Sequence, residues 1–167
     1  FGIKPDIVTF SKSIGNGFPL AAICGRRDIL EQLSPSGDVY QASTYAGNPA
    51  SVTAGLATIS TLAKDQNQIY PRITRICDSL VDGIREVIHD RKIPYCLNNV
   101  GSMYQLFFTS QDVRDMTSAK TSNPEMFTVL FRALLDKEIF IPPSQFETCF
   151  LSCAHVEEDI DRTIEGY

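Results

Sequence analysis

The chain has 167 residues, of which 43% are hydrophobic and 21% are charged, a composition typical of a folded globular protein. Its net charge of -5 argues against a nucleic-acid partner held through phosphate contacts. No apolar run approaches the roughly 18 residues of a membrane-spanning helix, so we expect no membrane partner. The five cysteines contain no CxxC pair, and we expect them to be reduced in a cytoplasmic protein without a metal site.

The chain opens without a start methionine and without a signal-peptide pattern. We therefore expect it to be the C-terminal part of a longer protein. Apolar runs at 7–10 and 20–24 are typical of buried strands, and 26–33 has helical spacing. Asn48 and Pro49 are a good cap and first position for a helix whose apolar stripe is then expected to be buried. This stripe consists of Val52, Leu56, Ile59 and Leu62.

The polar segment 65–68 is the best candidate for a domain boundary. The pattern beyond it predicts an amphipathic helix over 69–91, strands over 95–100 and 102–109, a loop over 110–121, a helix over 122–137, short strands over 139–141 and 149–152, and a last helix from 156. That last helix is acidic in its first turn, as the helix dipole favours. Residues 1–66 thus indicate the end of an α/β layer, and 67–167 indicate a small α+β domain.

Lys12 follows the first predicted strand directly and precedes a glycine-containing turn. Burial at the end of a strand disfavours the charged form of a lysine, and the neutral amine is a nucleophile. Covalent catalysis through a Schiff base needs that neutral amine. From position alone, a surface lysine with a solvated amine is the simpler interpretation.

Ser43 and Thr44 lie shortly before the helix start at Asn48. Small hydroxyl residues at such a place can bind a phosphate through backbone N–H groups and the helix dipole. Capping of the helix by Asn48 alone is the alternative, and both interpretations stay open on these residues.

Two segments resemble the class III aminotransferases, which are pyridoxal-phosphate enzymes of fold type I. Residues 5–12 read Pro-Asp-Ile-Val-Thr-Phe-Ser-Lys, and 15–22 read Gly-Asn-Gly-Phe-Pro-Leu-Ala-Ala, similar to the lysine segment of that family. Residues 40–49 read Tyr-Gln-Ala-Ser-Thr-Tyr-Ala-Gly-Asn-Pro, similar to its phosphate-contact segment. The resemblance implies an α/β fold: the end of a fold type I large domain over 1–66, then a small C-terminal α+β domain over 67–167.

The resemblance also implies roles for four residues. Lys12 would hold pyridoxal 5'-phosphate as a Schiff base and shuttle a proton, while Thr44 and Ser43 would contact the phosphate. In this family the threonine reaches across the interface of a homodimer with a shared active site. Glu147 would approach the site from the small domain, in a segment linked to gating; an exposed turn carboxylate is the equally open alternative.

Two departures from the family pattern affect the activity that we expect. Asn16 and Ser43 stand where the family commonly has glycine, which affects the expectation of typical activity more than that of the fold.

The segments around Tyr40 and Ser144 are closest to an aminomutase branch, which moves an amine within one small-molecule substrate. The rivals are an aminotransferase acting on an ω-amino acid and a non-catalytic dimerisation module. The aspartate that pairs with the pyridine nitrogen is expected before the first residue, so we expect this chain alone to be inactive.

Overall fold

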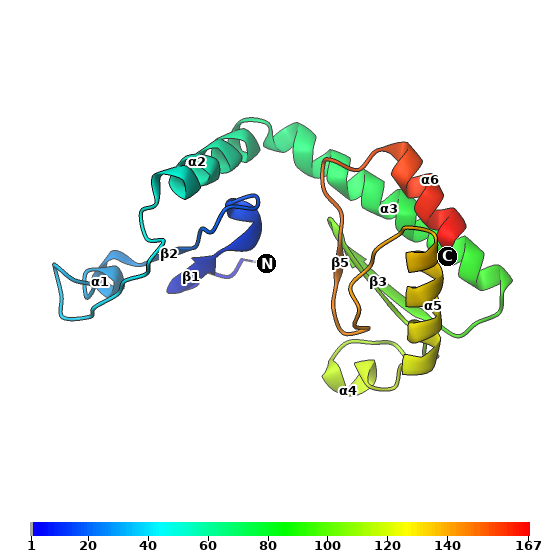
Figure 1. Ribbon diagram of the computed structural model, residues 1–167. Coiled ribbons are helices and arrows are strands. Elements are labelled where there is room, and N and C mark those ends of the chain that lie inside the picture. The colour runs from blue at the N-terminus through cyan, green and yellow to red at the C-terminus, as the bar shows by residue number, and fades with distance from the viewer. Residues whose placement is uncertain (1) are drawn as a thin grey trace. The chain divides into compact units, whose positions relative to one another are not determined.

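The computed structural model describes residues 2–167, which form two compact units that divide between Gln66 and Asn67 (Figure 1). Whether they are the end of a large cofactor-binding domain and a small domain stays a prediction. None of the helices over residues 2–167 combines the length and the apolar composition that crossing a bilayer requires.

The first unit begins with two antiparallel strands, β1 (Ile7–Phe10) and β2 (Ala22–Gly25). Their connection contains η1 (Lys12–Ile14), a single turn of 3-10 helix. The helix predicted over 26–33 is shorter than expected, since α1 (Arg27–Leu30) has 4 residues. The chain continues in turns towards Ser34 and Pro35, and proline cannot supply the N–H group that a longer helix needs.

Helix α2 (Pro49–Lys64) starts where the sequence predicts it. The Asn48 side chain accepts a hydrogen bond from the Ser51 N–H (3.1 Å), and Pro49 takes the first helical position. Gly55 lets this helix approach η1 closely. A Cβ at Gly55 would lie 3.5 Å from the Ile14 carbonyl oxygen and would collide with the Leu20 side chain. Helix α2 therefore supports the turn that begins at Lys12.

The expected burial of the first unit is wrong for this chain by itself. Ile7, Phe10 and Ile23 are 49%, 45% and 48% exposed. The reason is that β1 and β2 form a two-stranded sheet, with no third strand beside them among residues 2–167. Most of the apolar stripe of α2 is also exposed, with Leu56 at 66% and Ile59 at 52%, while Leu62 is half-buried.

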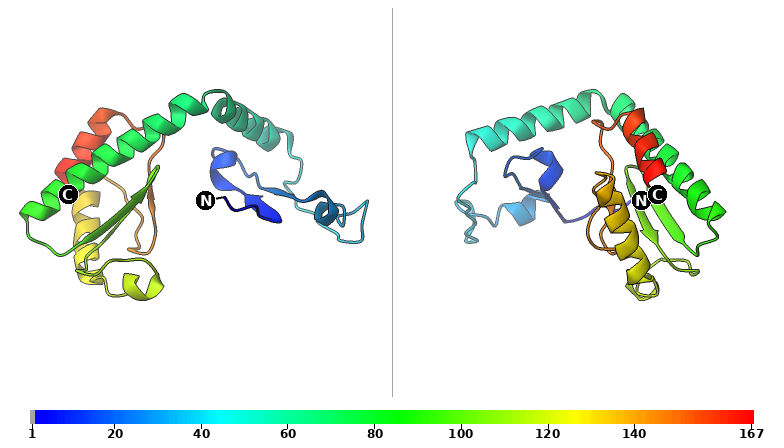
Figure 2. Two further views of the ribbon diagram at one scale, coloured as in Figure 1. Left: turned by 180° about the vertical axis from the view of Figure 1, so that it is seen from behind. Right: turned by 45° about the vertical axis from the view of Figure 1, so that its right-hand side comes forward.

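The second unit is a three-stranded antiparallel sheet with helices on one side (Figure 2). The strands β3 (Cys96–Val100), β4 (Met103–Phe107) and β5 (Cys149–Phe150) lie in that order. The covering helices are α3 (Gln66–Asp90), α5 (Pro124–Asp136) and α6 (Glu157–Gly166). The core between sheet and helices contains the fully buried side chains Cys77, Leu80, Val81, Ile84 and Leu134.

Two predictions for the second unit are wrong. The segment 110–121 is not all loop, because α4 (Met116–Ala119) forms within it. Asp115 and Ser118 stabilise its start reciprocally: the Ser118 N–H donates to Asp115 Oδ1 (2.8 Å), and the Asp115 N–H donates to Ser118 Oγ (3.1 Å). Residues 139–141 form no strand, although Ile141 is buried. Two prolines follow directly and cannot donate to a ladder.

Candidate active site

Lys12 occupies a strained backbone position between β1 and β2. Its φ is 54°, in the left-handed region that residues with a Cβ rarely adopt. The Lys12 carbonyl accepts from the Gly15 N–H (3.0 Å), and the Ser11 hydroxyl donates to the Leu20 carbonyl (3.3 Å). The surrounding turn therefore holds the lysine in a conformation of higher energy. Strained residues of this kind cluster at functional sites.

The surroundings of Lys12 differ from the dry environment expected. Its side chain is exposed and lines an open hollow of about 470 Å³, together with Ser13, Asn16, Gly17, Phe18 and Pro19. The first unit by itself therefore does not provide the expected desolvation, because Lys12 and its neighbours Ser13 and Asn16 are exposed in it. The amine is accessible to a bound molecule.

Ser43 and Thr44 lie in the turn that leads into α2. The Ser43 hydroxyl accepts from the Tyr45 N–H (3.4 Å), and its carbonyl accepts from the Ala46 N–H (3.0 Å). The Ser43 side chain therefore shapes the turn, while the exposed Thr44 hydroxyl stands next in the chain. The start of the 16-residue helix α2 follows, and its dipole favours an anion. Among residues 2–167 no hydrogen bond joins Lys12 to Ser43 or Thr44.

Glu147 is exposed and lies in a turn of the second unit, formed by residues 144–148. Its N–H donates to the Ser144 carbonyl (3.0 Å). Lys12 belongs to the first unit, so a joint role of the two residues in one site stays a prediction.

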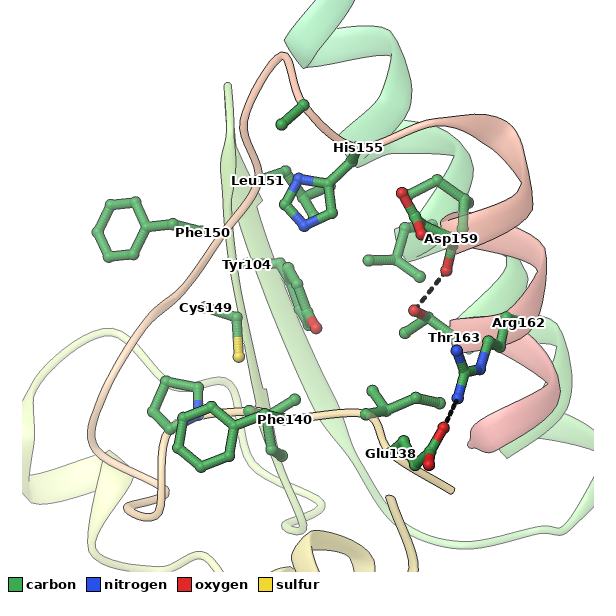
Figure 3. Close-up of a pocket in the computed structure, with 16 residues that line it drawn as sticks. Tyr104, Glu138, Phe140, Cys149, Phe150, Leu151, His155, Asp159, Arg162 and Thr163 are labelled. Carbon is green, nitrogen blue, oxygen red and sulfur yellow. Dashed lines mark hydrogen bonds and ion pairs between the residues drawn. The ribbon is translucent and has the colours of Figure 1, made fainter. Parts of the chain in front are cut away.

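Sequence reasoning missed a pocket of about 420 Å³ within the second unit (Figure 3). Its floor includes Tyr104, whose hydroxyl lies 3.4 Å from the Tyr167 hydroxyl. Burial raises the pKa of both phenols. Burial also raises the pKa of Cys149, which lies opposite Tyr104 in the β4–β5 pair. Tyrosines 63 positions apart carry no local signal that could have revealed this pair.

The charged groups at the edge of this pocket are already engaged. The Arg162 guanidinium donates to the Glu138 carboxylate (2.9 Å) and to the Lys137 carbonyl (2.9 Å). In the part of the chain that the structure describes, no group of three or more His, Cys, Asp and Glu side chains could hold a metal ion.

Comparison with known proteins identifies the family. Residues 1–148 match the family model described as Aminotransferase class-III. The chain therefore belongs to the class III aminotransferases, as the lysine and phosphate segments predict.

Its relatives are more specific. The chain is 46% identical over 167 residues to glutamate-1-semialdehyde 2,1-aminomutase of Nitrosopumilus maritimus (strain SCM1), covering 100% of this chain and 39% of the relative. It is 44% identical over 166 residues to the protein of the same name from Methanothermobacter thermautotrophicus, covering 99% of this chain and 39% of the relative. The chain thus spans about two fifths of the length of these relatives.

Solved structures confirm the predicted fold class. A β-phenylalanine aminotransferase from Variovorax paradoxus matches with a TM-score of 0.84 at 24% identity, over 99% of this chain and 38% of that one. A glutamate-1-semialdehyde-aminomutase from Pseudomonas aeruginosa PAO1 matches with a TM-score of 0.80 at 20% identity, over 99% and 38%. At these identities the likeness concerns the fold alone.

Proposed function

We propose that the full-length protein is a pyridoxal 5'-phosphate-dependent aminomutase. It would convert glutamate-1-semialdehyde to 5-aminolevulinate, a step of tetrapyrrole synthesis, as a cytoplasmic homodimer. The observation that carries this proposal is the 46% identity to an aminomutase across the whole chain, including the lysine and phosphate segments. The strained backbone of Lys12 supports it, because the fold holds that residue in place at an energetic cost.

The residues present fit the cofactor in kind. Lys12 offers an exposed amine for covalent attachment, and Thr44 offers an exposed hydroxyl. Thr44 and the main-chain N–H of Ser43 would hold the phosphate, near the start of α2 where an anion is favoured. When bound, the cofactor supplies an aldehyde that captures amines and a ring that withdraws electrons from the attached carbon.

The roles of the chain's own residues follow from this placement. The Lys12 Nζ would accept a proton from one substrate carbon and return it to another atom, because an isomerisation neither gains nor loses protons overall. Glu147 would face the substrate from the second unit and keep the reacting molecule bound until the amine has moved. Exclusion of water from Lys12 would require parts of the whole protein other than the first unit, in which this side chain is exposed.

Replacement of Lys12 tests the proposal. In the full-length protein, Lys12→Ala should lower the isomerisation rate about 10²- to 10⁴-fold, the usual contribution of a positioned acid–base group. Borohydride should fix the cofactor covalently to the wild type but not to this variant. Lys64→Ala, at the exposed end of α2, is the matched control and should behave as the wild type. Fixation and turnover that survive Lys12→Ala would refute the assignment.

A second assay separates the aminomutase from an ordinary aminotransferase. The aminomutase should isomerise the semialdehyde without a keto-acid acceptor. Steady transfer of the amine of an ω-amino acid to 2-oxoglutarate, without isomerisation, would decide for the other activity. The 167-residue chain alone, given cofactor, should show neither activity.

A further inference from the structure

The turn formed by residues 144–148 carries Glu147 and leads directly into β5. Pro142 and Pro143 precede it and have no N–H groups to donate to the sheet. Within the turn, the Glu147 N–H donates to the Ser144 carbonyl (3.0 Å). This bond fixes the conformation of the turn, but it does not fix the position of the turn relative to the sheet. Contacts with the rest of the second unit therefore place the turn, and a side chain of the neighbouring strand β4 is one of them.

Gln105 of β4 makes two hydrogen bonds to this turn with one side-chain amide. Its Nε2 donates to the main-chain carbonyl of Gln145 (2.8 Å), and its Oε1 accepts from the Thr148 hydroxyl (3.2 Å). In the β4–β5 register, Tyr104 lies opposite Cys149, so Gln105 lies opposite Thr148, the residue immediately before the start of β5. The Gln105 amide thus joins β4 to Gln145, near the start of the turn, and to Thr148 at its end.

These two bonds are shielded and need an amide. Gln105 is half-buried, and Gln145 is 9% exposed. Hydrogen bonds away from water are stronger than solvated ones. Glutamate at this position would keep the acceptor for the Thr148 hydroxyl and lose the donor, and leucine would lose both.

We propose that Gln105 is a positioning residue, which fixes the 144–148 turn and so sets substrate affinity through Glu147. The inference rests on the proposed function, because it takes the Glu147 carboxylate to face the substrate. Gln105 itself would not touch the substrate. A loosened carboxylate weakens binding of substrate and transition state alike, so KM rises while kcat changes little.

The experiment compares four forms of the full-length protein. Gln105→Leu should raise KM for the semialdehyde about tenfold, as the loss of two shielded hydrogen bonds implies, with kcat within about twofold of the wild type. Gln105→Glu should give an intermediate KM. The matched control Gln68→Leu, on the exposed side of α3, should leave KM unchanged. Amide hydrogen exchange should be faster over residues 144–148 in Gln105→Leu and unchanged in the control.

A double substitution tests whether Gln105 acts through Glu147. In a Glu147→Gln background, Gln105→Leu should raise KM by less than about twofold, because the group it positions is already altered. Should Gln105→Leu fail to fold, Thr148→Val removes one of the two bonds and should raise KM about threefold, whereas Thr148→Ser should restore the wild-type value.

The two proposals fail in different ways. Unchanged KM and unchanged exchange in Gln105→Leu or Thr148→Val, while borohydride still fixes the cofactor to Lys12, would overturn the role of Gln105 alone. A wild-type protein that does not isomerise the semialdehyde would overturn the proposed function. In that case the exchange measurement still decides whether Gln105 holds the turn.

Discussion

Gly83 of α3 faces α6, and its replacement by alanine tests how closely the two helices pack. A Cβ at this position would collide with Cδ1 of Ile164 and lie 2.7 Å from Cγ1 and 3.1 Å from Cγ2. Because Ile164 is β-branched, rotation about χ1 cannot easily make room. Overpacking costs about 1–3 kcal/mol, whereas alanine in place of glycine stabilises a helix by about 1 kcal/mol. We expect a net loss of about 1 kcal/mol in the free energy of unfolding.

Urea unfolding of the chain followed by far-UV circular dichroism measures this change, since the sequence contains no tryptophan. Ile164→Val removes Cδ1, the nearest of the colliding atoms, and should cost about 0.5–1.5 kcal/mol alone. In the double variant the two losses should not add, with a favourable coupling of about 1 kcal/mol. If Gly83→Ala is stabilising and the two effects add, the close contact between α3 and α6 is refuted.

Three further outcomes follow from the described contacts. Burial raises the pKa of Cys77, Cys149, Tyr104 and Tyr167 above their unfolded values, so the unfolded chain loses these protons first as pH rises. Urea midpoints should therefore be highest below about pH 8.5 and fall above it, more steeply beyond about 10; constant midpoints up to pH 10.5 would contradict this. Asn48→Ala should destabilise α2 by about 0.5–2 kcal/mol in thermal melts, because the cap of Ser51 N–H is lost; an unchanged melt would exclude this cap. Gln145 Oε1 is buried without a hydrogen-bond partner among residues 2–167, so Gln145→Met should leave stability unchanged or raise it; a loss above about 1 kcal/mol would show that water binds this oxygen.

Local signals in the sequence were enough to predict several elements. Asn48 and Asn123 each precede a proline, and each caps the helix expected there. The strand before Lys12 also follows from a short β-branched and aromatic run. These features depend on neighbouring residues, which is why one sequence suffices to find them.

Other features depend on what lies beside a segment, and they were missed. The run 139–141 has the composition of a strand, but Ile141 packs into the core without a ladder partner. The strand β1 and the helix α2 have apolar patterns that predict burial, yet Ile7, Phe10 and Leu56 are exposed. The candidate site itself rested on resemblance, because an exposed lysine and an exposed threonine are ordinary surface residues by composition.

The β1–β2 hairpin has a practical consequence for work with the isolated polypeptide. Each of its two outer edges presents main-chain donors and acceptors that invite pairing with another molecule, and its apolar side chains are exposed. The isolated 167-residue polypeptide should therefore form concentration-dependent aggregates, because its first unit carries these open strand edges and exposed apolar side chains. A truncation that starts at Asn67 retains its own core and should remain dispersed at concentrations where the longer polypeptide precipitates.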